Sequence, residues 1–555
     1  MNKIMVYLVV IGLLSGGFFE NKAEAAPGDL DESFGVGGKV TELTDPPCDG
    51  DTALAIQPDG KILVAGNCFP FGFTVAQYLA NGTLDPDFGI GGFTQGVLGE
   101  KSVAHSVAVL PDGKILAGGV ARIEEDGRND NDNALVRYLQ DGSLDTSFGT
   151  GGFITDGLPH ADVPFQAADA LHQILVLPDG KILAGGVTNA ASNDDNVWLG
   201  RYHSDGTLDE SFGSGGKVIS ERLGGNNHQP PHPFGIQSDG KIIIIGYITT
   251  STNDFGLERY NNDGTIDLTF GADGLVTTDF GGTTDSNNGV SIQPDDKILV
   301  GGESASRLAL ARYNSDGTLD TGFGFGGLVA LQIGDRGSRL HAMIAQPDGK
   351  ILAAGFGDPR TGEPVQNLDF ALIRFNNDGT PDLNFGENGM VFTDLGFRER
   401  AYSIAIQNDR KIVLHGESNP NGGSGFFLTR YLGDEEVPQH QFYGFLPPLT
   451  ADGRTVFKLG SVIPVKFQLF DENSLPVSTA IAHLSLQKIS GTEPVGDPID
   501  ASSVSNADTG NQFRYSDDQY IYNLDTKPLS SGTWQLRAML DDGSTHTIQI
   551  DLKSK

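Results

Sequence analysis

Short runs of small and apolar residues alternate with Gly- and Asp-rich turns along most of this chain. In one typical stretch, the apolar run 106–110 is followed by Pro111-Asp-Gly-Lys114 and then by a second run at 115–119. An Asp-Gly pair supplies the positive φ angles that a tight antiparallel turn needs. A third run at 134–139 and a fourth after Gly151-Gly152 complete the unit. The pattern therefore predicts four short antiparallel strands, and it contains almost no long helical period.

This unit recurs seven times, and one copy is divided between the start and the end of the array. The motif D-x-x-F-G begins at Asp31, Asp85, Asp145, Asp209, Asp267, Asp320 and Asp382. The first copy has no R-Y strand before it, and the last R-Y strand, which ends at Tyr431, has no D-x-x-F-G after it. The halves complete each other if Lys39–Leu43 pairs with the strand ending at Leu432. We therefore expect an all-β seven-bladed β-propeller over residues 27–432. A β-solenoid is the alternative, but it would not need split ends.

The repeated units resemble the delta-sixty repeats of large exported bacterial proteins. The resemblance covers about 405 of the 555 residues and rests on the seven recurrences. Departures are local: Gln77 replaces Arg, Ser238 and Asn408 replace Pro, and Asp296 and Arg410 replace Gly. The resemblance implies a propeller-like exported protein, and it implies no defined biochemical activity.

A second β domain is expected after an acidic linker at residues 433–441. Residues 442–555 alternate apolar and polar positions in short segments such as 465–469 and 534–538. About seven such strands predict an immunoglobulin-like β-sandwich. The blocks Gly460–Phe467 and 520–546 resemble the PxKF domain, which implies a small accessory domain of bacterial exported proteins without a defined ligand.

Residues 1–26 have the pattern of a signal peptide. Lys3 precedes the apolar stretch Ile4–Phe19, and Ala23-Glu-Ala25 offers a small-x-small cleavage site. The apolar stretch is shorter than the roughly 20 residues that span a membrane. The sequence therefore predicts an exported bacterial protein that is secreted, periplasmic or on the cell surface, without membrane insertion.

The net charge of −35 narrows the choice of partners. A strongly acidic chain repels nucleic acids and anionic membranes, so neither is expected as a partner. Divalent cations and basic surfaces stay compatible with this charge. Solubility alone is the simpler explanation for it.

No catalytic signature is present, and we assign no catalytic residues. The D-x-x-F-G aspartates are interpreted as turn caps that pair with the R-Y arginines, and the phenylalanines as wedges between blades. Gly322–Gly327 matches G-x-G-x-x-G only through the repeat itself, and prolines separate His228 from His232. A hydrolase or lyase with a site at the central channel is the alternative function. It would require titratable side chains that converge at the mouth of the channel.

Connections on one side of the predicted ring vary, whereas the turns P-D-G-K and D-G-T-L-D on the other side are nearly constant. Variable loops on a constant scaffold are typical of binding faces, although unconstrained drift produces the same variation. We expect an exported, non-enzymatic binding, adhesion or structural scaffold protein. It would act as a monomer, with a protein or carbohydrate ligand on the variable side.

Acidic insertions on the variable side are candidates for Ca²⁺ binding, the one cofactor considered. The insertion 120–133 contributes Asp126, Asp130 and Asp132, and the insertion 189–196 contributes Asp194. Hard cations prefer several carboxylate or carbonyl oxygens, which such loops can supply. A solvated acidic loop without a metal is the alternative interpretation.

Cys48 and Cys68 are the only cysteines and are expected to form a disulfide. They flank the first Asp59-Gly60 turn at similar distances, so they would lie opposite each other at the open end of one hairpin. Export makes oxidation available. Two unpaired thiols are the alternative.

Overall fold

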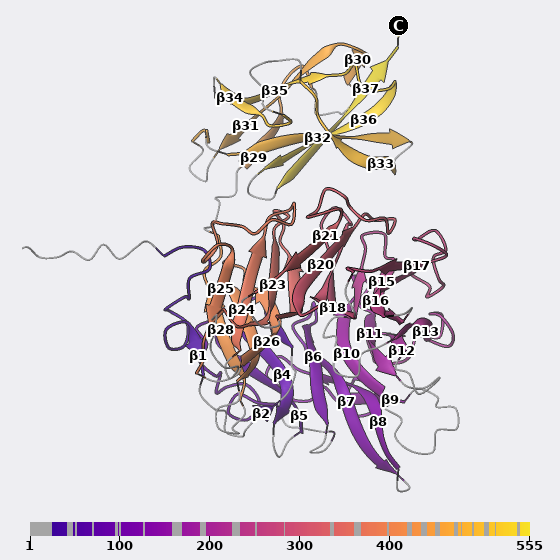
Figure 1. The fold of residues 1–555 in the computed structure, drawn as a ribbon, viewed down its shortest axis with the longest axis vertical. Coiled ribbons are helices and arrows are strands. Elements are labelled where there is room, and N and C mark those ends of the chain that lie inside the picture. Colours follow the sequence, from indigo (N-terminus) through magenta and orange to yellow (C-terminus); the bar gives the residue numbers. More distant parts are fainter. Residues whose placement is uncertain are drawn as a thin grey trace, which may run out of the picture.

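In the computed structural model the protein is all-β, and the residues that it describes form 37 strands and no helix (Figure 1). It describes residues 25–554 except 42–47, 50–52, 69–71, 95–97, 99–101, 126–127, 158–168, 189–195, 225–232, 250–251, 282–283, 334–337, 360–367, 397–398, 419–424, 435–440, 450–454, 471–474, 479, 491–492, 504–509, 517 and 541–543. The signal-peptide interpretation of residues 1–26 falls almost wholly outside these residues. Within the described part, no helix is long and apolar enough to cross a membrane.

Four sheets in the repeat region each contain four antiparallel strands in chain order or close to it. The first contains β2 (Cys48–Asp49), β3 (Leu54–Ile56), β4 (Ile62–Cys68) and β5 (Gly72–Tyr78). The second contains β6 (Val103–Val109), β7 (Ile115–Glu125), β8 (Arg128–Tyr138) and β9 (Phe153–Asp156). The third contains β18 (Asp285–Ile292), β19 (Ile298–Ser304), β20 (Arg307–Tyr313) and β21 (Leu328–Leu331). The fourth contains β22 (Arg339–Ala345), β23 (Ile351–Gly357), β24 (Asp369–Phe375) and β25 (Met390–Thr393).

A fifth sheet combines two repeat units. It contains β10 (Asp169–Val176), β11 (Ile182–Thr188), β12 (Asn196–Tyr202), β13 (Lys217–Gly224), β14 (Phe234–Ile236), β15 (Ile242–Thr249), β16 (Asn253–Tyr260) and β17 (Leu275–Thr278). A single residue pair, Gly224 with Tyr247, joins the two units. The sequence pattern did not predict this link, because it comes from an extension of β13 beyond the usual length of a fourth strand.

The first and last parts of the repeat array share a sixth sheet. Its strand order is β1 (Lys39–Val40), β28 (Phe427–Tyr431), β27 (Ile412–Ser418) and β26 (Glu399–Ile406). Lys39 pairs with Thr429 and Val40 with Leu428. The expected pairing of the N-terminal strand with the last R-Y strand is therefore confirmed, although β1 is only two residues long.

The insertion at 120–133 is a hairpin and not the loop that its polarity suggested. β7 and β8 continue in register from Ile115 opposite Tyr138 to Glu125 opposite Arg128. Figure 1 shows this hairpin extending away from the C-terminal sheets. The side of the repeats that carries the variable connections therefore faces away from the second β region.

Two sheets form the C-terminal region and share one core. One contains β29 (Gln441–Phe445), β31 (Val462–Phe470), β34 (Arg514–Ser516) and β35 (Gln519–Asp525). The other contains β30 (Thr455–Lys458), β32 (Ala482–Ser490), β33 (Glu493–Asp500), β36 (Gly532–Leu540) and β37 (Thr545–Lys553). Buried side chains from both sheets, among them Phe467, Leu484 and Leu536, pack in a single hydrophobic cluster. Buried and less buried positions alternate along β31, as expected for a strand with one face on a core.

Candidate functional site

Each D-x-x-F-G aspartate is the centre of a compact cluster of charged and aromatic side chains. In one repeat, Asp209 Oδ2 accepts a hydrogen bond from Arg201 Nε at 2.8 Å and lies 3.0 Å from Lys181 Nζ. Its Oδ1 accepts hydrogen bonds from the N–H and hydroxyl of Ser211. The Arg201 guanidinium lies over the Phe212 ring, 4.6 Å from its centroid. We call this arrangement the aspartate–arginine cluster.

In every repeat except the first, the aspartate–arginine cluster also contacts the residues that follow in the next repeat or directly after the array. Arg201 Nη1 donates a hydrogen bond to the carbonyl of Asn262, which lies in the following repeat. Equivalent arginine-to-carbonyl contacts link Arg137 to Ser204, Arg259 to Ser315, Arg312 to Asn377 and Arg430 to Ala80. Arg374 instead pairs with the carboxylate of Asp434. The contact from Arg430 to Ala80 connects the last repeat with the first.

Buried phenylalanines fill the space between neighbouring repeats. Phe148 is fully buried and packs against Gly206 of the next repeat. A Cβ at Gly206 would lie 2.9 Å from the Phe148 ring, and the residue has a φ of +90°, so glycine is favoured there on both counts. The interpretation of these motifs as turn caps, ion pairs and wedges is confirmed.

Ionisation of the clustered aspartates is strongly favoured. The hydroxyl of Ser211 lowers the pKa of Asp209, burial opposes this, and Lys181 and Arg201 lower the pKa further. At Asp31, burial alone would raise the pKa, but hydrogen bonds from Ser33 and the charges of Lys411 and Arg430 bring it to about 2. These carboxylates are therefore ionised and matched by cations of the same chain, which is the role of a scaffold and not of a general acid.

The first repeat departs from this arrangement. Gln77 stands where the other repeats have arginine, and its amide donates to Gln57 Oε1 at 2.7 Å. Asp85 then has Lys61 as its cation, at 2.9 Å. The junction between the first and second repeats therefore lacks the arginine contact that the other junctions have.

Histidine, tyrosine and asparagine side chains occupy one recurring position on the first strand of several repeats. Each of these strands has a β-bulge, and the extra residue is His105, His172, Asn288, His341 or Tyr402. His105 lies 5.4 Å from His172, centroid to centroid, and His341 stacks on Tyr402 at 4.9 Å. These pairs connect neighbouring repeats, and the sequence analysis did not single them out.

Burial keeps the inner histidines neutral. It lowers the pKa of His172 to about 3, with a contribution from His105, and that of His415 to about 4. At His341, burial and the charges of Arg339 and Arg400 lower the pKa to about 3. Histidines with such pKa values are weak bases at neutral pH, because efficient general bases have a pKa near the working pH.

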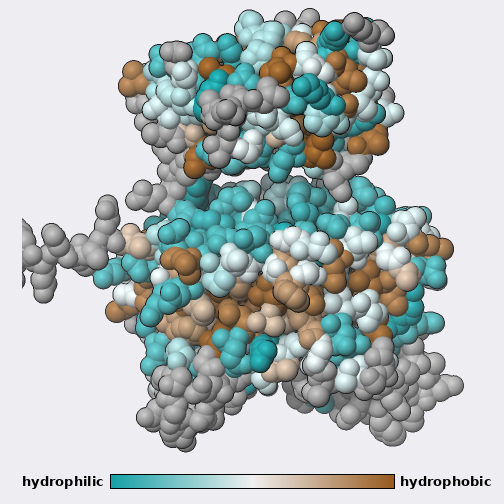
Figure 2. Space-filling view, turned by 45° about the horizontal axis from the view of Figure 1, so that its top comes forward, coloured by the Kyte–Doolittle hydropathy of each residue, from teal (hydrophilic) through white to brown (hydrophobic). Residues whose placement is uncertain are grey.

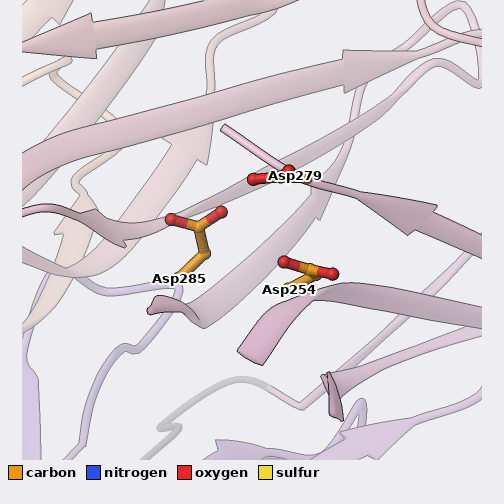
Figure 3. Close-up of side chains that lie close together, drawn as sticks. All are labelled: Asp254, Asp279 and Asp285. Atoms are coloured by element: carbon orange, nitrogen blue, oxygen red, sulfur yellow. The ribbon is translucent and has the colours of Figure 1, made fainter. Parts of the chain in front are cut away.

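Among the residues that the structure describes, carboxylates gather on the variable side in two groups of three. Asp254, Asp279 and Asp285 each offer one oxygen within 4.8 Å of the other two, and Figure 3 shows their carboxylates facing one another. Asp369, Asp394 and Glu399 form the second group by the same measure. In both groups the first and third members are buried and the second is exposed. Oxygen-only ligand sets of this kind suit hard divalent cations.

The sequence analysis missed both groups, although one local signal was available. An aspartate follows the fourth strand in the segments Thr278-Asp-Phe-Gly281 and Thr393-Asp-Leu-Gly396. The other members lie 25 residues before Asp279 or Asp394 and five or six residues after them. Only the packing of one repeat against the next shows that these positions meet.

The aspartates expected to bind Ca²⁺ lie elsewhere. Asp126 and Asp194 fall outside the described residues, and only the backbone of Asp130 is described. Asp132 lies on β8 at the same distance before the R-Y tyrosine as Asp254 does on β16. Neither described group of three carboxylates includes Asp132. Ca²⁺ binding at Asp126, Asp130, Asp132 and Asp194 therefore stays a prediction.

Cys48 and Cys68 form a disulfide, as expected. They are directly opposite each other where β2 pairs with β4, and both are fully buried. The bond lies at the variable side of the first repeat.

Comparison with known proteins supports the repeat fold and gives no activity. A family model described as a domain of unknown function (DUF5122) beta-propeller matches residues 57–88, 110–148, 177–212, 237–270, 293–323 and 346–385. No curated protein matches the chain.

Similar solved structures are distant. Apo prolyl oligopeptidase B from Galerina marginata is 12% identical with a TM-score of 0.35, and the match covers 75% of this chain and 58% of that one. The full extracellular region of plexin A4 is 9% identical with a TM-score of 0.32, over 90% and 75% of the two chains. Fructan 1-exohydrolase IIa from Cichorium intybus is 9% identical with a TM-score of 0.25, over 81% and 90%. These likenesses are too low to transfer a function.

Proposed function

We propose, on the premise that this chain is a β-propeller-repeat protein, that it is an exported, non-enzymatic scaffold for binding or adhesion. Its ligand would be a protein or carbohydrate held on the variable side. The repeats would form a seven-bladed ring, and the C-terminal region would be an immunoglobulin-like sandwich of the PxKF type. The protein would act as a monomer.

Contacts between the two ends of the array support the ring. Asp31 in the first D-x-x-F-G motif pairs with Arg430 in the last repeat at 2.8 Å. Leu54 N–H donates to the hydroxyl of Ser403 at 3.1 Å, which joins the first repeat to the last through their inner strands. A ring of seven units with a split repeat would make these contacts.

The observation that best supports a binding role is the difference between the two sides of the repeats. On the side of the constant turns, the same cluster of charges recurs, and its aspartates are paired with arginines of the same repeat. On the variable side, the connections differ, and one of them is the projecting β7–β8 hairpin. A rigid scaffold with dissimilar loops is the arrangement by which binding faces are built.

Export agrees with the pattern of residues 1–26 and with the disulfide. Disulfides persist in oxidising compartments and are rare in the cytosol. We therefore propose that the mature chain works outside the cytoplasm of a bacterium, in the periplasm, at the cell surface or in the medium.

A hydrolase or lyase at the central channel is the second candidate. The pairs His105–His172 and His341–Tyr402 favour it, because they place titratable groups on the inner strands. Their low histidine pKa values disfavour base catalysis at neutral pH.

A binding screen with a matched pair of variants tests the proposal. The full mature chain is applied to arrays of bacterial and plant polysaccharides and of extracellular matrix proteins. One variant replaces residues 122–131 by a short Asn-Gly turn, and the control carries Asp263→Asn on the constant turns. We expect the first variant to lose binding and the control to retain it. Turnover of ester, peptide or glycoside substrates that is abolished by His172→Gln would instead support the enzyme.

A further inference from the structure

We propose that Asp254, Asp279 and Asp285 form a Ca²⁺ site at the junction between two successive repeats. This site goes beyond the binding role proposed above and does not depend on it. One oxygen from each residue lies within 4.8 Å of the other two. Because Ca²⁺ binds oxygens at about 2.3–2.6 Å, two of its ligands lie at most about 5 Å apart. The three oxygens can therefore share one ion.

The buried carboxylate of Asp285 points to a ligand. Asp285 is only 1% exposed. Asp285 Oδ2 accepts a hydrogen bond from the N–H of Phe280 at 2.9 Å, whereas Oδ1 is buried without a hydrogen-bond partner in the described part of the chain. Burying a polar oxygen without a partner is unfavourable, and more so for an ionised one. Figure 3 shows this carboxylate turned toward Asp254 and Asp279, so a cation there would supply the missing interaction.

Three elements from two repeats bring the carboxylates together. Asp254 is near the start of β16, Asp279 directly follows β17, and Asp285 is the first residue of β18. Asp279 Oδ1 accepts a hydrogen bond from the N–H of Gly281 at 2.6 Å, and Gly281 has a φ of +80°. The turn fixes the exposed carboxylate over the two buried ones. A bound ion would therefore fasten β18 to the strands of the preceding repeat.

The same arrangement recurs at another junction. Asp369, Asp394 and Glu399 occupy the corresponding positions on β24, after β25 and on β26. Asp394 Oδ1 accepts from the N–H of Gly396 at 2.6 Å, and Gly396 has a φ of +99°. The placement of the three acids is thus a recurring property of the repeat and not an isolated surface cluster.

The junction that lies between the two junctions with acidic groups has different residues at the same positions. Its corresponding residues are Arg307, Gln332 and Ser338. Arg307 stands at the position of Asp254, and its Nε donates to Gln332 Oε1 at 3.3 Å. Where the acids are replaced, a cationic side chain of the chain itself lies at the junction. Where the acids are present, we propose that a cation from solution takes the corresponding place.

Calcium binding by the full mature chain tests the site. After treatment with EDTA, bound Ca²⁺ is counted by equilibrium dialysis with elemental analysis up to about 10 mM CaCl₂, a range that covers weak extracellular sites. The melting temperature is measured in parallel, with NaCl at equal ionic strength as the reference. We expect Ca²⁺ to raise the melting temperature by several degrees, because it binds only the folded chain. We expect Asp285→Asn to bind one ion fewer than the wild type.

Two further variants keep the test decisive. Asp279→Asn changes an exposed residue and retains an oxygen for Gly281, so it should fold even if Asp285→Asn does not, and it should also bind one ion fewer. Asp316→Asn makes the same charge change on the constant turns and should bind as many ions as the wild type. A wild-type chain without bound Ca²⁺ at about 10 mM overturns the site. An unchanged ion count in Asp279→Asn overturns it as well.

Discussion

The two sides of the repeat array treat their carboxylates in opposite ways. On the side of the constant turns, aspartates such as Asp209 are paired with an arginine and a lysine of the same repeat. On the variable side, Asp254, Asp279 and Asp285 face one another. Figure 2 shows hydrophilic side chains over the part of the array that faces the C-terminal sheets. The first set of charges therefore holds the repeats together, whereas the second set places three carboxylates within 4.8 Å of one another.

Deleting residues 27–44 should have the largest effect on stability, because it removes the contacts that join the two ends of the repeat array. The deletion removes β1, the fully buried Phe34 and Asp31, which pairs with Arg430 and Lys411. Loss of one buried aromatic ring costs about 3–5 kcal/mol, and an uncompensated buried arginine adds to this. We expect the melting temperature to fall sharply, as measured by calorimetry. A chain lacking only residues 1–26 is the reference, and equal stability of the two chains would contradict the ring.

Replacing one clustered aspartate should lower the free energy of unfolding by about 3–5 kcal/mol where that aspartate is the counter-charge of a buried arginine. Asp209→Asn leaves the buried guanidinium of Arg201 without its counter-charge. Asp85→Asn is the matched control, since its repeat has Gln77 in place of arginine, and the described cation beside Asp85 is the partly exposed Lys61. We expect denaturant unfolding to show a cost of about 1 kcal/mol or less for Asp85→Asn. Equal costs would show that the arginine contributes little.

The double variant Cys48→Ser/Cys68→Ser should lower the free energy of unfolding by about 3 kcal/mol. The disulfide closes a loop with a sequence separation of 20 residues, and a cross-link of this length restricts the unfolded chain by about that amount. Denaturant titration measures the loss, with reduced wild-type protein as the comparison. Two thiols that titrate in the unreduced native protein would contradict the bond.

Mild acid should destabilise the protein through its inner histidines before the clustered aspartates respond. The pKa of His341 is about 3 in the folded chain, below the value of about 6.5 expected when unfolded. Between these values the unfolded chain binds more protons, so the free energy of unfolding falls as the pH decreases. Each such histidine contributes up to about 1.4 kcal/mol per pH unit.

The pH dependence of the melting temperature between pH 6.5 and about 4 measures this effect. His341→Gln should flatten the profile, and His203→Gln, at an exposed histidine, should not. The clustered aspartates affect stability at lower pH. The pKa of Asp31 is about 2 in the folded chain, below its value of about 4 when unfolded. The stabilisation by these aspartates is therefore present above about pH 4 and is lost as the pH falls toward about 2. A profile of His341→Gln identical to that of the wild type would remove the histidine explanation.

Calcium binding at the β7–β8 hairpin should give the smallest effect. Calorimetry at millimolar Ca²⁺ tests the predicted ligands Asp126, Asp130, Asp132 and Asp194. The titration uses a chain that carries Asp285→Asn and Asp394→Asn, so that heat from both groups of three carboxylates is removed. Asp130→Asn/Asp132→Asn in that background should abolish the residual heat. No residual heat in the background itself would reject this prediction.

The sequence predicted those features that lie within one repeat. These features involve residues that are separated by short stretches of regular pattern. Examples are the turn at Asp59-Gly60, the pairing of Cys48 with Cys68 and the contact of Arg201 with Asp209. Strand alternation and turn chemistry determine such contacts locally.

Apart from the phenylalanine wedges and the pairing of the N-terminal strand with the last repeat, features that depend on contacts between repeats were not predicted. The acids Asp254 and Asp285 are brought together by the packing of β16 against β18, which no local pattern encodes. The bulges that carry His172 and His341 likewise follow from the shape of the inner strands. The insertion at 120–133 became a hairpin because its two arms pair in register, although its polarity suggested a loop.

The pairing of β1 with β28 constrains the order in which the protein can mature. Lys39 leaves the ribosome long before its partner Thr429, so the earliest segment of the repeat array has to wait for the latest one. Contacts of such high sequence separation slow folding, and chains that wait expose unpaired strand edges. During synthesis, Asp31 therefore stays without its ion pair to Arg430, and the Phe34 ring without the Arg430 guanidinium over it, until residue 430 exists. Premature termination in the last repeat would leave an open and aggregation-prone chain, even though most of its repeats were intact.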